Sequence, residues 1–282
     1  MNTIECHIFI YLRYYMSIKK HIPNAITCCN LLCGCLAIVQ AFEGNLVYSA
    51  YLVGLAAIFD FFDGFAARML KVSSPIGKDL DSLADMVTFG VVPGIVMFKL
   101  LQINEFSYEN AVYSFQFIGG IEYLAFTIPI FSAIRLAKFN NDIRQSDSFI
   151  GVPTPANAIL IGSLALIILP FIKKQFYNLS NQSNENFIDV TTPGELVDRL
   201  FFIHCMLLFI TLIFSFLLVS ELPLFALKFK HFKLKDNEIR FVFLGLSLVM
   251  LVTLQFIGIP LIIILYILMS VISNLTKKKL AS

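Results

Sequence analysis

The sequence predicts an all-α, polytopic membrane protein with about eight transmembrane helices. Hydrophobic residues make up 58% of the 282 residues, charged residues make up only 14%, and the mean hydropathy is +0.80. Soluble domains average about 45–50% apolar and about 25% charged residues, so a water-soluble globule and a disordered chain are excluded. The net charge of +2 provides no strongly basic surface, and we therefore expect no nucleic-acid partner.

The chain contains a series of apolar segments. Their lengths are near the roughly 20 residues that a helix needs to span a bilayer. The last two are separated only by Gly258 and Pro260, which predicts a tight helical hairpin. The eight predicted spans are Ala25–Phe42, Leu46–Phe62, Leu83–Leu101, Phe117–Leu136, Ala156–Ile172, Leu200–Leu218, Phe241–Phe256 and Ile259–Ser273.

Basic residues indicate how these spans are oriented, because cytoplasmic loops carry an excess of Lys and Arg. With the N-terminus inside, 17 of the 21 basic residues fall in cytoplasmic segments, and Lys99, Lys173, Lys174 and Arg199 are left outside. We therefore expect a multi-pass protein of the cell (inner) membrane with both termini in the cytoplasm. Its lipid partner is the bilayer itself.

Three regions follow from this pattern. Residues 1–20 are expected to form an N-terminal extension or interfacial segment, residues 21–220 the membrane core, and residues 221–282 a hairpin with a basic tail. Met16 directly precedes the basic start of the first span, so a start at Met16 and a dispensable segment 1–15 are also expected.

An acidic cluster interrupts the apolar background. Five of the ten Asp residues lie between Asp60 and Asp85, and only Asp79 is out of helical phase with its neighbours. Residues three or four apart share a helix face, which places two carboxylates and a glycine on each of two stripes. A break at residues 73–75 lets the two helices lie antiparallel, with the acidic stripes facing each other. The stripes are Asp60, Asp63, Gly64 and Ala67 at the end of the second span, and Gly77, Asp81 and Asp85 at the start of the third.

Four facing carboxylates repel unless some are protonated or a cation holds them. Ligand sets made only of oxygen suit Mg²⁺, Mn²⁺ or Ca²⁺. One alternative is a set of solvated helix ends paired with Arg68, Lys71 and Lys78. A second alternative is a cation transporter, but its carboxylates are expected near the middle of the bilayer and these lie at one cytoplasmic edge.

The spacing Asp60-x2-Asp63-Gly64-x2-Ala67-Arg68-x8-Gly77-x3-Asp81-x3-Asp85 resembles the signature of the CDP-alcohol phosphatidyltransferase family at every fixed position. The resemblance implies a six-helix core, CDP-diacylglycerol as phosphatidyl donor, Mg²⁺ or Mn²⁺ with two ions per site, and a homodimer. The flanking stretches 22–27, 80–94, 134–140 and 149–156 favour L-serine as the acceptor. Glycerol phosphate, inositol phosphate and an amino-alcohol stay open as alternative acceptors.

The resemblance also implies roles for individual residues. It makes Asp60, Asp63 and Asp81 metal ligands, and makes Asp85 both a neighbour of the metals and the general base. The implied substrate-binding residues are Asn24, Thr27, Gly64, Ala67, Arg68, Ser74 and Gly77 for the nucleotide, and Arg135, Lys138 and Asn140 for the amino acid. For Arg135 and Lys138, anchoring at the cytoplasmic surface is an equal alternative, because basic residues gather there in any case.

Overall fold

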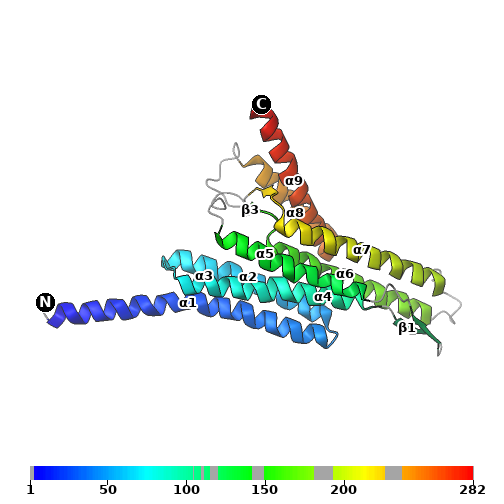
Figure 1. Cartoon of the computed structure of the whole chain (residues 1–282), viewed down its shortest axis with the longest axis horizontal. Coiled ribbons are helices and arrows are strands. Elements are labelled where there is room, and N and C mark those ends of the chain that lie inside the picture. The colour runs from blue at the N-terminus through cyan, green and yellow to red at the C-terminus, as the bar shows by residue number, and fades with distance from the viewer. Residues whose placement is uncertain are drawn as a thin grey trace.

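The computed structural model describes residues 3–103, 105–108, 111–114, 120–141, 149–180, 193–225 and 237–281. These residues are mostly helical, and Figure 1 shows long helices running side by side along the longest axis of the molecule. The α-helices are α1 (Thr3–Phe42), α2 (Leu46–Leu70), α3 (Pro75–Asp85), α4 (Val92–Leu101), α5 (Thr127–Asn141), α6 (Thr154–Ser180), α7 (Pro193–Val219), α8 (Glu238–Leu254) and α9 (Gly258–Ala281).

The remaining described elements are short. A π-helix, η1 (Met86–Val91), joins α3 to α4, and 3₁₀ turns η2 (Ile121–Phe126) and η5 (Gln255–Ile257) precede α5 and α9. Two antiparallel strand pairs lie in connections: β1 (Glu105–Tyr108) with β2 (Ala111–Ser114), and β3 (Phe149–Ile150) with β4 (Pro223–Leu224). The predicted all-α class is confirmed.

Six stretches of the described chain are long and apolar enough to cross a membrane, so the predicted number of eight spans is only approximate. The seventh and eighth predicted spans fall within one stretch, because α8 and α9 are separated only by η5. The fourth predicted span begins outside the described residues, and α5 itself has only 15 residues. The six stretches are His21–Phe42, Leu46–Leu70, Pro75–Leu101, Thr154–Gln175, Gly194–Val219 and Glu238–Thr276.

The third stretch, Pro75–Leu101, is the most enclosed of the six, since 61% of its most apolar part is buried. Small residues let its neighbours approach closely, as is typical of membrane helices. A Cβ on Gly94 of α4 would lie 2.7 Å from Pro129 of α5, and one on Gly34 of α1 would collide with Thr88 of η1. The stretch Pro75–Leu101, which carries Asp81 and Asp85 at its start, is therefore fixed from several sides.

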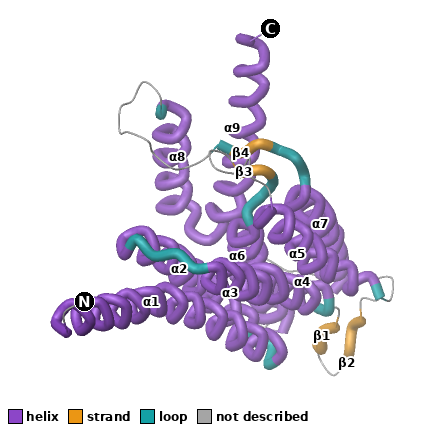
Figure 2. Tube along the Cα trace, turned by 60° about the vertical axis from the view of Figure 1, so that its left-hand side comes forward, coloured by secondary structure: helices purple, strands orange, loops and turns teal. Residues whose placement is uncertain are grey.

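Helix α8 and the C-terminal part of α9 extend away from the other helices, as Figure 2 shows. Their contacts with the rest of the described chain run mainly through α6 and β4. The Tyr266 hydroxyl donates to the Phe225 carbonyl at 2.8 Å, and the rings of Phe225, Phe243 and Tyr266 pack together. The predicted turn falls at η5, where a Cβ on Gly258 would lie 2.7 Å from the Met250 carbonyl.

The other end of the chain also extends from the bundle. Helix α1 continues toward the N-terminus past the helices beside it (Figure 1). The predicted boundaries at residues 20 and 220, and the dispensability of residues 1–15, stay predictions.

Candidate active site

The turn between α2 and α3 brings the two acidic stripes together. Helix α2 ends where Lys71 adopts the left-handed conformation, with φ 52° and ψ 42°. Helix α3 begins at Pro75, and the Ser74 hydroxyl caps it by accepting from the Gly77 N–H at 3.0 Å. Serine at the N-cap and proline at the first helical position are the residues this geometry favours. The chain therefore reverses between Lys71 and Ser74.

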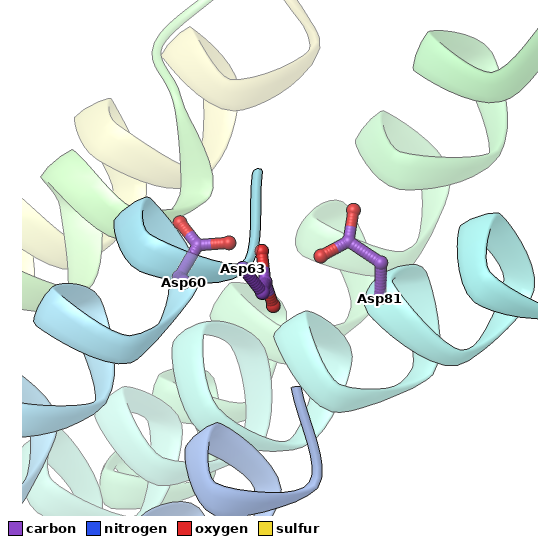
Figure 3. Close-up of side chains that lie close together, drawn as sticks. All are labelled: Asp60, Asp63 and Asp81. Carbon is purple, nitrogen blue, oxygen red and sulfur yellow. The ribbon is translucent and has the colours of Figure 1, made fainter. Parts of the chain in front are cut away.

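Three carboxylates converge across this reversal. Figure 3 shows Asp60 and Asp63 on α2 and Asp81 on α3 with their side chains close together. One oxygen from each lies within 4.8 Å of the others. Asp63 is buried, and Asp60 and Asp81 are half-buried. The shared helix faces predicted from spacing thus produce a compact group of oxygen atoms.

Helix α1 supplies polar partners to this group from a buried position. The Thr27 hydroxyl lies 2.7 Å from Asp63 Oδ2 and 3.1 Å from the Pro23 carbonyl, and the charged carboxylate is the stronger acceptor. One turn along, Asn30 Nδ2 donates to Asp85 Oδ1 at 3.3 Å. Both α1 side chains are at least 96% buried, since Thr27 is 4% exposed and Asn30 0%. Helix α1 therefore orients one carboxylate on each acidic stripe.

The three converging carboxylates fit a divalent cation. No described lysine or arginine forms an ion pair with Asp60, Asp63 or Asp81, so their like charges are not neutralised by a basic side chain. Carboxylates forced together in a partly buried site favour a cation that neutralises them. Oxygen donors on two helices suit a hard ion such as Mg²⁺ or Mn²⁺. This group of three Asp residues can bind a metal.

Asp85 lies one turn beyond Asp81, further into the stretch Pro75–Leu101, and is not one of the three converging carboxylates. It interacts electrostatically with Asp60, Asp81 and Asp63, and also with Arg135 on α5. Asp85 therefore sits between the acidic cluster and a buried cation.

A cavity of about 250 Å³ opens beside the acidic cluster. It is bounded by the end of α2, the turn and the start of α3, with one face contributed by α1. Six of the residues expected to bind the nucleotide line it, and Arg68 does not. The lining residues are Pro23, Asn24, Thr27, Asp63, Gly64, Ala67, Val72, Ser73, Ser74, Gly77, Lys78 and Asp81.

The two glycines of the cavity wall differ in what surrounds them. A Cβ on Gly77 would lie 2.9 Å from Asn24 Oδ1 and 3.0 Å from Ser74 Oγ, so this glycine lets α3 pack closely on α1. A Cβ on Gly64 would meet nothing within 4 Å. Gly77 is thus required by packing, whereas Gly64 leaves open space in the cavity.

The residues expected to bind the amino acid do not gather at one point. Arg135 is 6% exposed, and its Nη1 donates to Thr154 Oγ1 on α6 at 3.3 Å. Asn140 instead joins α5 to α3, since its Nδ2 donates to Ser82 Oγ at 2.8 Å. Lys138 is exposed. Arg135 also interacts electrostatically with Asp85.

Two site residues were missed from sequence. Lys78 lines the cavity, and its Nζ donates to the Asn140 carbonyl at 3.0 Å. Asn30 contacts Asp85 and was not among the expected site residues. Polar residues three apart at positions 24, 27 and 30 in an apolar span were the available signal for Asn30. Lys78 carried no comparable signal beyond its place next to Gly77.

The family model for CDP-alcohol phosphatidyltransferase matches residues 20–183, which is more than half of the chain. The chain therefore belongs to the CDP-alcohol phosphatidyltransferase family. The match includes the acidic cluster, the cavity and Arg135, and residues 184–282 lie beyond it.

Several curated relatives carry the name CDP-diacylglycerol–serine O-phosphatidyltransferase. The one from Bacillus subtilis is 37% identical over 152 residues, covering 54% of this chain and 76% of the relative. One from Helicobacter pylori is 33% identical over 168 residues, covering 59% of this chain and 64% of the relative. One from Methanocaldococcus jannaschii is 33% identical over 158 residues, covering 55% and 67%. The chain is therefore similar to bacterial and archaeal proteins that share this one name among themselves.

Asn substitution at Asp60, Asp63 or Asp81 is expected to weaken Mn²⁺ binding by roughly 10-fold or more, because even the outer-shell partners of a metal typically contribute 10–100-fold. Electron paramagnetic resonance of free Mn²⁺ titrated with detergent-solubilised protein measures this loss without catalysis. Asp79→Asn is the matched control, since Asp79 is exposed on the same helix as Asp81. Equal Mn²⁺ affinity in all four variants and the wild type contradicts a metal site here.

The variant Gly64→Leu is expected to place a side chain in the cavity and to weaken CDP binding by roughly 10-fold or more. Its melting temperature should stay near that of the wild type. The open space around Gly64 is the reason, because a side chain enters the cavity without displacing described neighbours. The same change at Gly54, which also has nothing within 4 Å on α2, is the control and should bind CDP normally. Normal CDP affinity in Gly64→Leu shows that nucleotide does not use this cavity.

Proposed function

We propose that the chain transfers the phosphatidyl group of CDP-diacylglycerol to the hydroxyl of L-serine, giving phosphatidylserine and CMP. The observation that carries this proposal is the convergence of the three carboxylates beside a cavity. Asp63 and Asp81 line this cavity together with Gly64, Ala67 and Gly77 of the family signature. The names of the relatives support serine as the acceptor. The family resemblance further supports a homodimer, and the distribution of basic residues supports a cytoplasmic site in the inner membrane.

In this reaction the serine oxygen forms a bond to the lipid-side phosphorus, and the bond from that phosphorus to the CMP oxygen breaks. Asp60, Asp63 and Asp81 would hold two divalent ions, Mg²⁺ or Mn²⁺. When bound, such ions neutralise the charge that develops on the pyrophosphate and orient it. Thr27 holds the Asp63 carboxylate in place, and Gly64 and Ala67 leave room for ribose and cytosine. Asn24, Ser74 and Lys78 supply polar groups to the same cavity.

Asp85 accepts the proton of the serine hydroxyl in this proposal. Its hydrogen bond from Asn30 fixes the carboxylate, and its position beyond Asp81 separates it from the groups that hold the pyrophosphate. Arg135, buried nearby, supplies a positive charge for the serine carboxylate.

The direct test is incubation of the purified full chain with CDP-diacylglycerol, Mn²⁺ and one acceptor at a time, with CMP release and the lipid product measured. Release of CMP with L-serine and formation of phosphatidylserine is the expected result. Release with glycerol phosphate, inositol phosphate or an amino-alcohol, but not with serine, overturns the acceptor and keeps the reaction class. No CMP with any acceptor overturns the proposed function.

The variant Asp85→Asn is expected to lower kcat by about 10²- to 10⁴-fold, the usual contribution of a general base. CDP-diacylglycerol affinity should stay within a few-fold, because the substitution leaves Asp60, Asp63 and Asp81 in place. Initial rates of CMP release and calorimetric titration in detergent measure the two effects separately. Joint loss of Mn²⁺ and nucleotide binding, with unchanged turnover of bound substrate, identifies Asp85 as a ligand instead of the base.

A further inference from the structure

Several buried polar atoms on α1, α5 and α6 have no hydrogen-bond partner among the described residues. Asn157 on α6 is 0% exposed, and neither its Oδ1 nor its Nδ2 is bonded among the described residues. Ser132 Oγ and Arg135 Nε on α5 and Asn30 Oδ1 on α1 are likewise unpartnered in the described part of the chain. Buried polar atoms are nearly always satisfied, so a group of them in one region requires an explanation.

These residues belong to one region of the fold. Arg135 Nη1 bonds Thr154 Oγ1, which joins a face of α5 to a face of α6. Ser132 lies one turn from Arg135 on α5, and Asn157 lies one turn from Thr154 on α6. Arg135 also interacts electrostatically with Asp85, and Asn30 donates to Asp85 from α1.

The π-helix η1 forms the centre of this region. It begins directly after Asp85, and α1, α5 and α6 all pack against it. A Cβ on Gly90 of η1 would lie 3.2 Å from the Ser132 Cβ, which places Ser132 beside the π-turn. Single π-helical turns are rare and occur frequently at functional sites. The unpartnered atoms and the π-turn are independent observations that mark the same place.

We infer that Ser132, Arg135 and Asn157, with Asn30, form the pocket that binds the amino and carboxylate groups of the acceptor. This inference rests on the proposed function and names specificity-determining residues for it. Arg135 Nε and Asn157 Nδ2 are donors that suit the carboxylate. Asn30 Oδ1 and Asn157 Oδ1 are acceptors that suit the ammonium, and exchange of the Asn157 amide atoms leaves one donor and one acceptor.

The balance of these groups favours an amino acid over a phosphorylated alcohol. A phosphate presents only oxygen atoms and is bound best by several cationic donors. The pocket offers one cation and at least two acceptors, which a zwitterion satisfies and a phosphate does not. Without its ligand, the pocket contains buried amide groups that have no hydrogen-bond partner, and this lowers stability.

This cost in stability distinguishes a binding role of Asn157 from a structural role. Leu has nearly the shape of Asn and needs no hydrogen bond, so Asn157→Leu is expected to melt at the wild-type temperature or higher. Its affinity for L-serine, measured by calorimetric titration of the full chain in detergent with CDP and Mn²⁺, should fall 10-fold or more. CDP affinity should stay within twofold. Asn157→Ala is the second variant and should lose serine affinity equally.

Ser49→Ala is the matched control. Ser49 Oγ is also buried and unpartnered in the described chain, but Ser49 precedes Asp60 by three turns of α2, about 16 Å. This variant should keep its serine and CDP affinities. Serine affinity that is unchanged in both Asn157 variants overturns the inference, and so does a fall in melting temperature with joint loss of serine and CDP binding.

The titration separates this inference from the proposed function, because it requires no turnover. Serine binding that depends on Asn157, in a protein that releases no CMP with serine, rejects the proposed function and keeps the pocket. Phosphatidylserine formation with normal serine binding by the Asn157 variants rejects the pocket and keeps the function. Absence of any serine binding by the wild type rejects the pocket.

Discussion

Repulsion among carboxylates that the fold forces together is the constraint on which the structure of this site depends. Two unit charges about 5 Å apart repel by about 3 kcal/mol at an effective dielectric constant of about 20, and Asp60, Asp63 and Asp81 have oxygens within 4.8 Å. The surrounding features resist this repulsion. The capped turn at Ser74 fixes the two helices, and Thr27 and Asn30 hold Asp63 and Asp85 by hydrogen bonds from α1.

The acidic cluster also divides the site into two halves of different character. On one side, the cavity of about 250 Å³ is built from the α2–α3 turn and α1, with open space at Gly64. On the other side, α5 and α6 enclose unpartnered polar atoms around the π-turn that follows Asp85. Asp85 lies between the two halves, within electrostatic reach of both the cluster and Arg135. A reaction between two substrates requires that both are held close together in a fixed orientation.

Features that depend on spacing within one helix were predictable from sequence, and features that depend on contacts between helices were not. The two stripes of Asp residues follow from the periodicity of a helix, and Ser74 and Pro75 from the chemistry of helix starts. The π-turn after Asp85 leaves no pattern in the sequence, and the burial of Arg135 beside an exposed Lys138 depends on contacts between helices. Asn157 was missed because a lone Asn in an apolar span does not reveal its neighbours.

The position of the site within the chain limits what the last helices contribute. All residues discussed for binding or catalysis lie between Asn24 and Asn157, within the family match at residues 20–183. In the described chain, α8 and α9 meet this region mainly through α6, which carries Thr154 and Asn157, and through β4, which pairs with β3 just before α6. Their influence on the acidic cluster therefore passes through the position of α6. Any effect of α8 and α9 on the site should thus appear first at the unpartnered polar groups of α5 and α6.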